Sequence, residues 1–237
     1  MLKRLFQKKS LPTNEPPQFI PWAIQQQLIT TQAATIVDIG AHLGETTQLL
    51  LQAFPNASIH SIEPFQDSFL QLKQSFSQQK NVFPHQLAIS NVNGFASLNV
   101  NEFLQTNSLL SSNKVHASID DLTSMKATQQ VATQTLDSFV AEQNIEKIDL
   151  LKIDAQGLTY EILEGAGCLL AEKRIQLIYA EVEFIEIYKG EKRFAEIEML
   201  LRSKGYQFMQ FFNLNNVATK QLAWADAVFV PHHSIHE

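Results

Sequence analysis

The chain has 237 residues, of which 45% are hydrophobic and 18% are charged, and its formal net charge at pH 7 is −6. This length allows one α/β domain with a full hydrophobic core and excludes two domains of ordinary size. Because the first ten residues contain four lysines and arginines, the rest of the chain is more acidic than the total. An acidic body is poorly suited to phosphate backbones, so no nucleic-acid partner is expected.

Residues 1–30 start basic, contain several prolines, and are predicted to be a loosely ordered arm with a short helix over 22–31. The opening lacks the apolar core of a signal peptide, and no apolar run reaches the ~20 residues that span a bilayer. We therefore expect a cytoplasmic protein without a transmembrane segment, whose basic arm allows a weak contact with an acidic membrane surface. The single cysteine, Cys168, excludes an internal disulfide and is expected to be a small core residue.

The segment 31–237 alternates strand and helix patterns, which predicts a mainly parallel sheet built from βαβ units. Its first part contains expected strands over Thr35–Ile39, Ser58–Ile62 and Asn81–His85, and expected helices over Thr46–Ala53 and Phe65–Phe76. Its last part contains expected strands over Asp149–Asp154, Leu177–Val182, Tyr206–Phe212 and Trp224–Val230, and expected helices over Leu136–Gln143, Tyr160–Lys173 and Phe194–Lys204.

The alternation is interrupted over residues 86–135. Phe95–Val100 and Gln130–Thr135 are predicted to be two antiparallel strands, and a serine- and asparagine-rich stretch from Asn107 to Ser124 joins them. Long irregular connections inside a compact domain are usually functional or disordered. We interpret 86–135 as a β-rich insertion whose polar part acts as a mobile lid over the site.

The segment Val37-Asp38-Ile39-Gly40-Ala41-His42-Leu43-Gly44 reads as a buried strand that runs into a glycine turn. About 20 residues later, Glu63 ends the next strand, at the spacing where doubly wound folds bind ribose hydroxyls. Asp38 would repel a pyrophosphate, which argues against a dinucleotide. S-adenosylmethionine fits better, because Asp38 can face its cations, directly or through water, while the N–H groups after Gly40 hold its carboxylate. An ordinary capped strand–turn–helix remains the alternative.

A second chemical signal is Leu150-Leu151-Lys152-Ile153-Asp154-Ala155-Gln156-Gly157. Lys152 and Asp154 lie two apart on a strand and therefore share a face. Asp154 ends that strand, where open α/β sheets bind ligands. A surface Lys–Asp pair is the alternative interpretation.

Taken together, VDIGAHLG, IEP, TLDSF, LLKIDAQG with EILEGA, and AEVEF resemble the FkbM-type class I methyltransferases over roughly residues 35–230. The resemblance implies an α/β, Rossmann-like fold. Its sheet has seven mostly parallel strands, with helices on both faces and the last strand inserted antiparallel near an edge. It also implies S-adenosylmethionine as cofactor and methylation of hydroxyl groups on sugars, polyketides or related natural products.

The resemblance also implies site residues. Ser108-Leu109 matches a serine–leucine element in the family's insertion, and Lys152, Asp154 and Gly157 match its K-x-D-x-x-G. Three positions depart from the family pattern, because Gln156 and Thr159 stand where acids are usual and His42 replaces a residue that is commonly Asn. The predicted cofactor-binding residues are Asp38, Gly40, Ala41, His42, Gly44, Glu63, Pro64, Ala88 and Asp154.

Methyl transfer to a hydroxyl requires alignment of the acceptor oxygen and removal of its proton. The predicted catalytic residues are Asp154 as the first candidate base, Glu181 (or Glu183) as the second, and Lys152. His42, near the cofactor turn, is a further alternative base. Asp154 and Glu181 could share Mg²⁺, but no third ligand is evident, so no metal is predicted. The expected partner is a small-molecule or glycan acceptor. A cofactor-binding module without transfer activity and an NAD-dependent oxidoreductase remain the alternatives.

Overall fold

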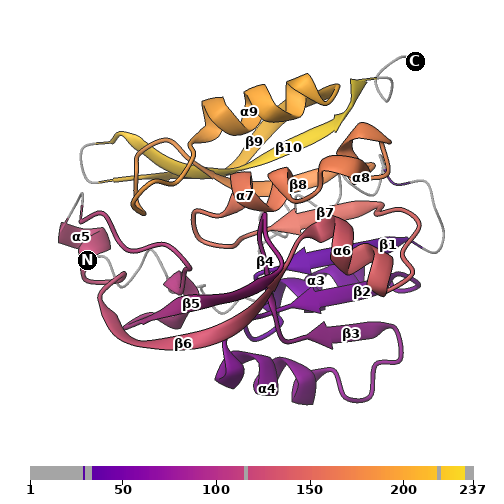
Figure 1. Ribbon diagram of the computed structural model, residues 1–237, viewed down its shortest axis with the longest axis horizontal. Coiled ribbons are helices and arrows are strands. Elements are labelled where there is room, and N and C mark those ends of the chain that lie inside the picture. Colours follow the sequence, from indigo (N-terminus) through magenta and orange to yellow (C-terminus); the bar gives the residue numbers. More distant parts are fainter. Residues whose placement is uncertain (1–28, 30–33, 115–116, 218–219, 233–237) are drawn as a thin grey trace, which may run out of the picture.

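The computed structural model describes Ile29 and residues 34–114, 117–217 and 220–232 (Figure 1). The predicted arm over 1–30 and helix over 22–31 lie outside the described residues, apart from Ile29. In the described part of the chain, no helix is both long and apolar enough to cross a membrane.

Seven strands form the central sheet, in the order β3–β2–β1–β7–β8–β10–β9. β1, β2, β3, β7 and β8 are parallel, whereas β10 runs antiparallel to both β8 and β9. The prediction of a mostly parallel sheet with the last strand antiparallel next to an edge is therefore confirmed. The strand bounds are β1 Thr35–Ile39, β2 Ser58–Ile62, β3 Val82–His85, β7 Leu150–Ile153, β8 Ile178–Glu183, β9 Tyr206–Asn216 and β10 Leu222–Pro231.

Helices cover both faces of the sheet, as predicted. Alternate strand residues point to opposite faces, so Val37 and Ile39 of β1 join one core cluster and Ile36 joins the other. The first cluster packs against α6, α7, α8 and α9, and the second packs against α3 and α4. The helix bounds are α3 Glu45–Ala53, α4 Gln66–Ser75, α6 Leu136–Glu142, α7 Thr159–Glu164, α8 Gly167–Ala171 and α9 Phe194–Ser203.

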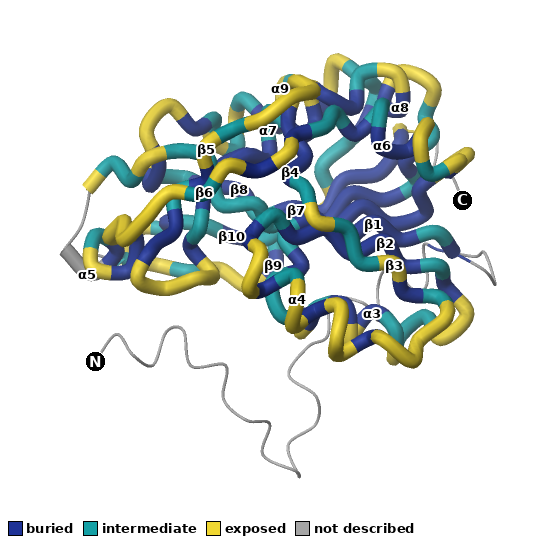
Figure 2. The backbone as a smooth tube through the Cα atoms, turned by 60° about the horizontal axis from the view of Figure 1, so that its bottom comes forward, coloured by how far each residue is buried: buried dark blue, intermediate teal, exposed yellow. Residues whose placement is uncertain are grey.

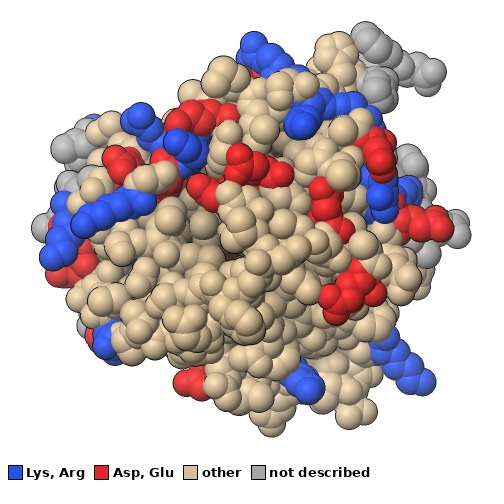
Figure 3. Space-filling model, viewed as in Figure 1, with Lys and Arg blue, Asp and Glu red and all other residues tan. Residues whose placement is uncertain are grey.

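The segment between β3 and α6 forms a second sheet of three strands, in the order β4–β6–β5. β5 (Gly94–Asn101) and β6 (Met125–Gln134) are antiparallel, and β4 (Ala88–Ile89) pairs with β6 in parallel. A 3-10 turn, η1 (Leu104–Thr106), and a short helix, α5 (Ala117–Asp120), lie in the connection between β5 and β6. Figure 2 shows much of this small sheet exposed, whereas β1, β2 and β7 are buried. On the face drawn in Figure 3, acidic and basic side chains are both present and are interspersed with uncharged residues. The predicted antiparallel pair is confirmed.

The single helix predicted over Tyr160–Lys173 is wrong, because the structure has two helices there, α7 and α8. The reason is a contact from α6. The Asp137 carboxylate accepts hydrogen bonds from the Cys168 and Leu169 amides at 2.8 and 3.1 Å, and so caps a new helix start. The expectation that Cys168 is a core residue is also wrong, because it is exposed at this new first turn.

Candidate functional site

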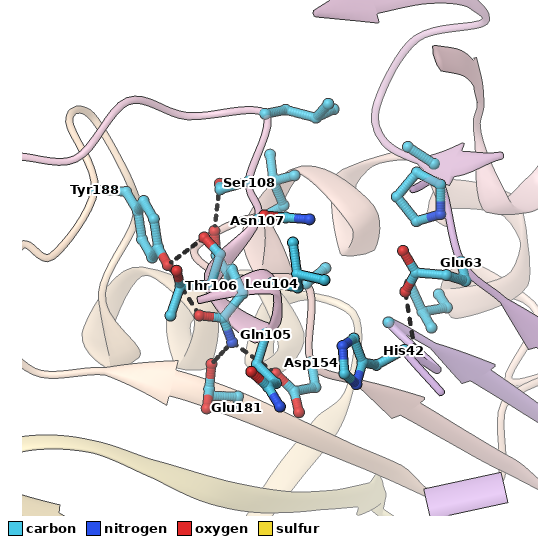
Figure 4. A pocket seen from close by; sticks show the side chains of 18 of the residues that line it. His42, Glu63, Leu104, Gln105, Thr106, Asn107, Ser108, Asp154, Glu181 and Tyr188 are labelled. Atoms are coloured by element: carbon cyan, nitrogen blue, oxygen red, sulfur yellow. Dashed lines mark hydrogen bonds between the residues drawn. The ribbon is translucent and has the colours of Figure 1, made fainter. Parts of the chain in front are cut away.

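A cavity of about 600 Å³ lies at the carboxyl ends of β1, β2, β7 and β8, where the insertion closes it (Figure 4). Parallel α/β sheets bind ligands at this edge, because helix N-termini and strand-end side chains converge there. In Figure 4, Glu63 lies on one side of the cavity, Tyr188 and Glu181 on the other, and Asp154 and His42 between them. The lining segments include 39–42, 62–64, 87–89, 104–109, 154–156, Glu181, Glu183 and 187–188.

The loop after β1 passes directly against the end of β7. Gly40 has a φ of +76°, and a Cβ on it would lie 1.8 Å from the carbonyl oxygen of Asp154, so only glycine fits. The amides of Gly40 and Ala41 donate to the Ile62 carbonyl, each at 3.0 Å. The N–H groups after Gly40 were expected to hold the cofactor carboxylate, but in the structure the Ala41 amide donates to Ile62 and the His42 amide donates to Glu63.

Glu63 lines the cavity at the end of β2 and is itself buried. Its Oε2 accepts the His42 amide at 2.9 Å, and its Oε1 accepts the Phe65 amide at 2.8 Å. Each carboxylate oxygen can accept a further hydrogen bond, so both remain available to hydroxyl groups. Burial raises the pKa of Glu63, an effect that the two amide donors oppose.

Asp38 and Lys152 do not line the cavity but lie beneath it. Asp38 is fully buried, and its Oδ2 accepts the Thr47 hydroxyl at 2.7 Å. The Lys152 ammonium lies 3.1 Å from Asp38 Oδ1 and also donates to the Ile39 and Gly40 carbonyls at 3.3 and 3.1 Å. The pair therefore supports the loop after β1 from below. This placement does not support direct contact of Asp38 with cofactor cations or of Lys152 with an acceptor.

Gln156 connects the carboxylates of the site to two surrounding segments. Its side-chain amide donates to Asp154 Oδ1 at 2.9 Å and to Glu181 Oε1 at 3.0 Å. Its side-chain oxygen accepts the Tyr188 hydroxyl at 2.9 Å, and its main-chain oxygen accepts the Ser108 hydroxyl at 2.7 Å. The residue has a φ of 52°, unusual without glycine, so these contacts hold a strained backbone.

Two carboxyl groups at the acidic end of the cavity, those of Glu181 and Glu183, have raised pKa values. Burial, followed by the neighbouring Asp154 and Glu183 carboxylates, raises the pKa of Glu181 well above its usual value. Burial and the Glu191 carboxylate do the same for the pKa of Glu183. Asp154 keeps 42% of its side chain exposed and lies 3.7 Å from the Lys152 ammonium. Groups with shifted proton affinities in a cavity are typical of functional sites.

The structure gathers most, but not all, of the predicted set. Glu181 lines the cavity with seven residues of the predicted cofactor set: Gly40, Ala41, His42, Glu63, Pro64, Ala88 and Asp154. Gly44 does not, because it starts α3 against α4, where a Cβ would lie 2.4 Å from the Phe76 ring. Thr159 also points elsewhere, since its hydroxyl donates to the Glu181 carbonyl at 2.8 Å.

Sequence reasoning missed Tyr188 and the linking role of Gln156. Tyr188 follows β8 by several residues in an irregular segment, and no pattern marks it there. Gln156 was noted only as a departure from a family pattern, although a residue just before Gly157 at a strand-to-helix turn is a recognisable candidate for a left-handed backbone. Among the described residues, no three His, Cys, Asp or Glu side chains are arranged to hold a metal ion.

Comparison with known proteins agrees with this architecture. The methyltransferase FkbM domain model matches residues 38–208. The 2-O-methyltransferase NoeI of Sinorhizobium fredii is 26% identical over 175 residues, 71% of each chain. Methyltransferase 1 of Beauveria bassiana is 26% identical over 183 residues, which cover 72% of this chain and 71% of its own.

Among solved structures, magnesium protoporphyrin IX methyltransferase (ChlM) from Synechocystis PCC 6803 with bound SAM superposes with a TM-score of 0.47 at 11% identity. The superposition covers 88% of this chain and 76% of that one. The assignment rests on the domain match, which spans most of the chain and contains Glu63, Asp154 and Glu181. The chain belongs to the FkbM methyltransferase family and is an S-adenosylmethionine-dependent methyltransferase.

Proposed function

We propose that the protein transfers the methyl group of S-adenosylmethionine to a hydroxyl of a sugar, a glycan or a related natural product. The observation that carries this proposal is the position of Asp154. Asp154 directly follows β7, and its partly exposed carboxylate lines the cavity between the Glu63 side and the Glu181 side (Figure 4). The name of NoeI, a 2-O-methyltransferase, supports oxygen as the methylated atom.

The Glu63 side of the cavity fits the nucleoside part of the cofactor. Glu63 has the acceptor capacity for two ribose hydroxyls, because each of its oxygens accepts only one amide. The apolar residues Pro64, Ala88 and Ile89 line the same region and suit a purine ring. Bound there, the cofactor supplies a methyl group made electrophilic by its sulfonium.

Asp154 is the proposed proton acceptor. As the acceptor oxygen bonds to the methyl carbon, the carbon–sulfur bond breaks and the hydroxyl proton moves to a carboxylate. Asp154 suits this step, since its carboxylate lines the cavity and 42% of its side chain is exposed there. Glu181 suits it less, because burial and the neighbouring carboxylates raise its pKa and so disfavour its ionised form. Gln156 holds the two carboxyl groups in place without adding charge.

Two measurements on the same protein test the proposal. Calorimetry with S-adenosylhomocysteine reports cofactor binding, and transfer of tritiated methyl from S-adenosylmethionine to a panel of glycosides and hydroxylated natural products reports activity. Binding together with transfer to a hydroxyl supports the proposal. Binding without transfer to any panel member favours a cofactor-binding module, and absence of binding contradicts the placement of the cofactor.

A further inference from the structure

Glu183 presents an unsatisfied carboxylate oxygen at the cavity. The residue is 2% exposed and lines the cavity from the end of β8. Its Oε2 has no hydrogen-bond partner among the described residues. A buried polar atom without a partner is costly, and nearly all such atoms in folded proteins find one. The missing partner is therefore expected to come from a ligand.

The surroundings of Glu183 show which kind of ligand. Glu181 lies two residues away on the same face of β8, and the Gln156 side-chain amide donates to both Asp154 and Glu181. The Glu191 carboxyl group, which does not line the cavity, also acts on Glu183. No lysine or arginine is among the described residues that line the cavity. The Lys152 ammonium does not line the cavity; it binds Asp38 and the loop carbonyls and lies 3.7 Å from Asp154 Oδ2. This end of the cavity is thus acidic, with three carboxyl groups and, in the described part of the chain, a single ammonium beside them.

We propose that Glu183, together with Glu181 and Asp154, forms a subsite for a primary ammonium group. An ammonium brings three N–H donors and a positive charge, so it satisfies Glu183 Oε2 and offsets the repulsion among the carboxylates. Two sources carry this group: the amino-acid end of the cofactor and an amine on the acceptor. The inference rests on the proposed function only in taking this cavity as the place where both molecules bind.

The Glu183→Gln variant removes the charge and keeps the shape of the side chain. Glu186→Gln is the matched control, because Glu186 is an exposed acid of the same segment outside the cavity. Calorimetry compares S-adenosylhomocysteine with 5′-methylthioadenosine, which lacks the amino-acid end. A second titration compares glucosamine with glucose on protein saturated with S-adenosylhomocysteine.

If the cofactor supplies the ammonium, Glu183→Gln weakens binding of S-adenosylhomocysteine by about tenfold or more and leaves 5′-methylthioadenosine unchanged. If the acceptor supplies it, S-adenosylhomocysteine binds as before and the wild-type preference for glucosamine over glucose disappears. Either result supports the subsite, and Glu186→Gln behaves as wild type in both.

Equal weakening of S-adenosylhomocysteine and 5′-methylthioadenosine overturns the subsite, since it reports a general distortion of the cavity. Unchanged binding of all four probes overturns it as well. If Glu183→Gln does not fold, the same four binding measurements are made on Glu181→Gln. Failure of the wild-type protein to bind S-adenosylhomocysteine would count against the proposed function instead, so the two failures are distinguishable.

Discussion

Lys152 and Asp38 face each other on neighbouring strands β7 and β1, with Nζ 3.1 Å from Oδ1 and both side chains buried. Burial lowers the pKa of Lys152, but the Asp38 and Asp154 carboxylates together raise it by more. The net shift of this pKa is upward, which favours the charged ammonium. Because the same ammonium binds the carbonyls of Ile39 and Gly40, this ion pair determines the position of the loop that leads into the cavity.

We expect Asp38→Asn to act mainly on stability. The change leaves the Lys152 ammonium buried without a negatively charged partner at Asp38. Removing one partner of a buried ion pair typically lowers the free energy of unfolding by about 3–5 kcal/mol. Chemical denaturation measures the loss. The control is Glu102→Gln, which breaks an exposed ion pair with Lys126 and should change stability by no more than about 0.5 kcal/mol. Equal effects of the two variants would contradict the structural role of the buried pair.

We expect Glu63→Gln to weaken S-adenosylhomocysteine binding by about tenfold or more. The amide retains one acceptor oxygen, but its NH₂ group then faces an N–H donor from either His42 or Phe65. Calorimetry at constant pH measures the change. Asp67→Asn, an exposed acid at the start of α4, provides the comparison and should bind as wild type. An unchanged affinity in Glu63→Gln would remove Glu63 from the cofactor site.

Gln156→Glu, which restores the acid usual in the family, should destabilise the protein more at about pH 8 than at about pH 5. The pKa of Glu181 is raised in the folded protein, so the contribution of this residue to stability is fully present below its unfolded-state pKa. That contribution is lost as the pH rises through its folded-state pKa. A further carboxylate beside Glu181 raises the pKa of Glu181 further. Thermal melts at both pH values test this, with the exposed Gln130→Glu as control. A destabilisation independent of pH would contradict the electrostatic role of Gln156.

Asp154→Asn should lower turnover by roughly 10²-fold or more, the usual effect of losing a general base. The melting temperature should change by only a few degrees, since 42% of the Asp154 side chain is exposed. Single-turnover assays with the acceptor found in the panel measure the chemical step. Normal turnover in this variant would move the search for a base to Glu181, Glu183 and His42, which line the same cavity.

The polar connection between β5 and β6 should behave as a lid. It contributes Asn107, Ser108 and Leu122 to the cavity wall, and the Ser108 hydroxyl binds the Gln156 carbonyl at 2.7 Å. Hydrogen exchange should be fast over 107–114 and 117–124 in the free protein and slower once cofactor and acceptor are bound. The paired strands β5 and β6 serve as internal reference. Identical exchange in free and bound protein would reject the lid.

The residue pattern was enough to predict a mainly parallel sheet, most of its strands and helices, and the two acids at strand ends, Glu63 and Asp154. These features depend on local information, because apolar periodicity identifies each element and strand ends meet at one edge of a parallel sheet. For the same reason the antiparallel strands of the insertion were predictable from alternation alone. The seven strands and the antiparallel last strand were implied only by the family resemblance.

What those acids contact depends on how distant segments pack in the folded protein. Gln156 meets Ser108 and Tyr188, which are 48 and 32 residues away in the chain, and α8 begins where Asp137 reaches Cys168 from 31 residues away. The burial of Asp38 likewise depends on Lys152, on a strand that follows more than one hundred residues later. Such contacts depend on which distant segments pack together, and one sequence carries no local signal for that.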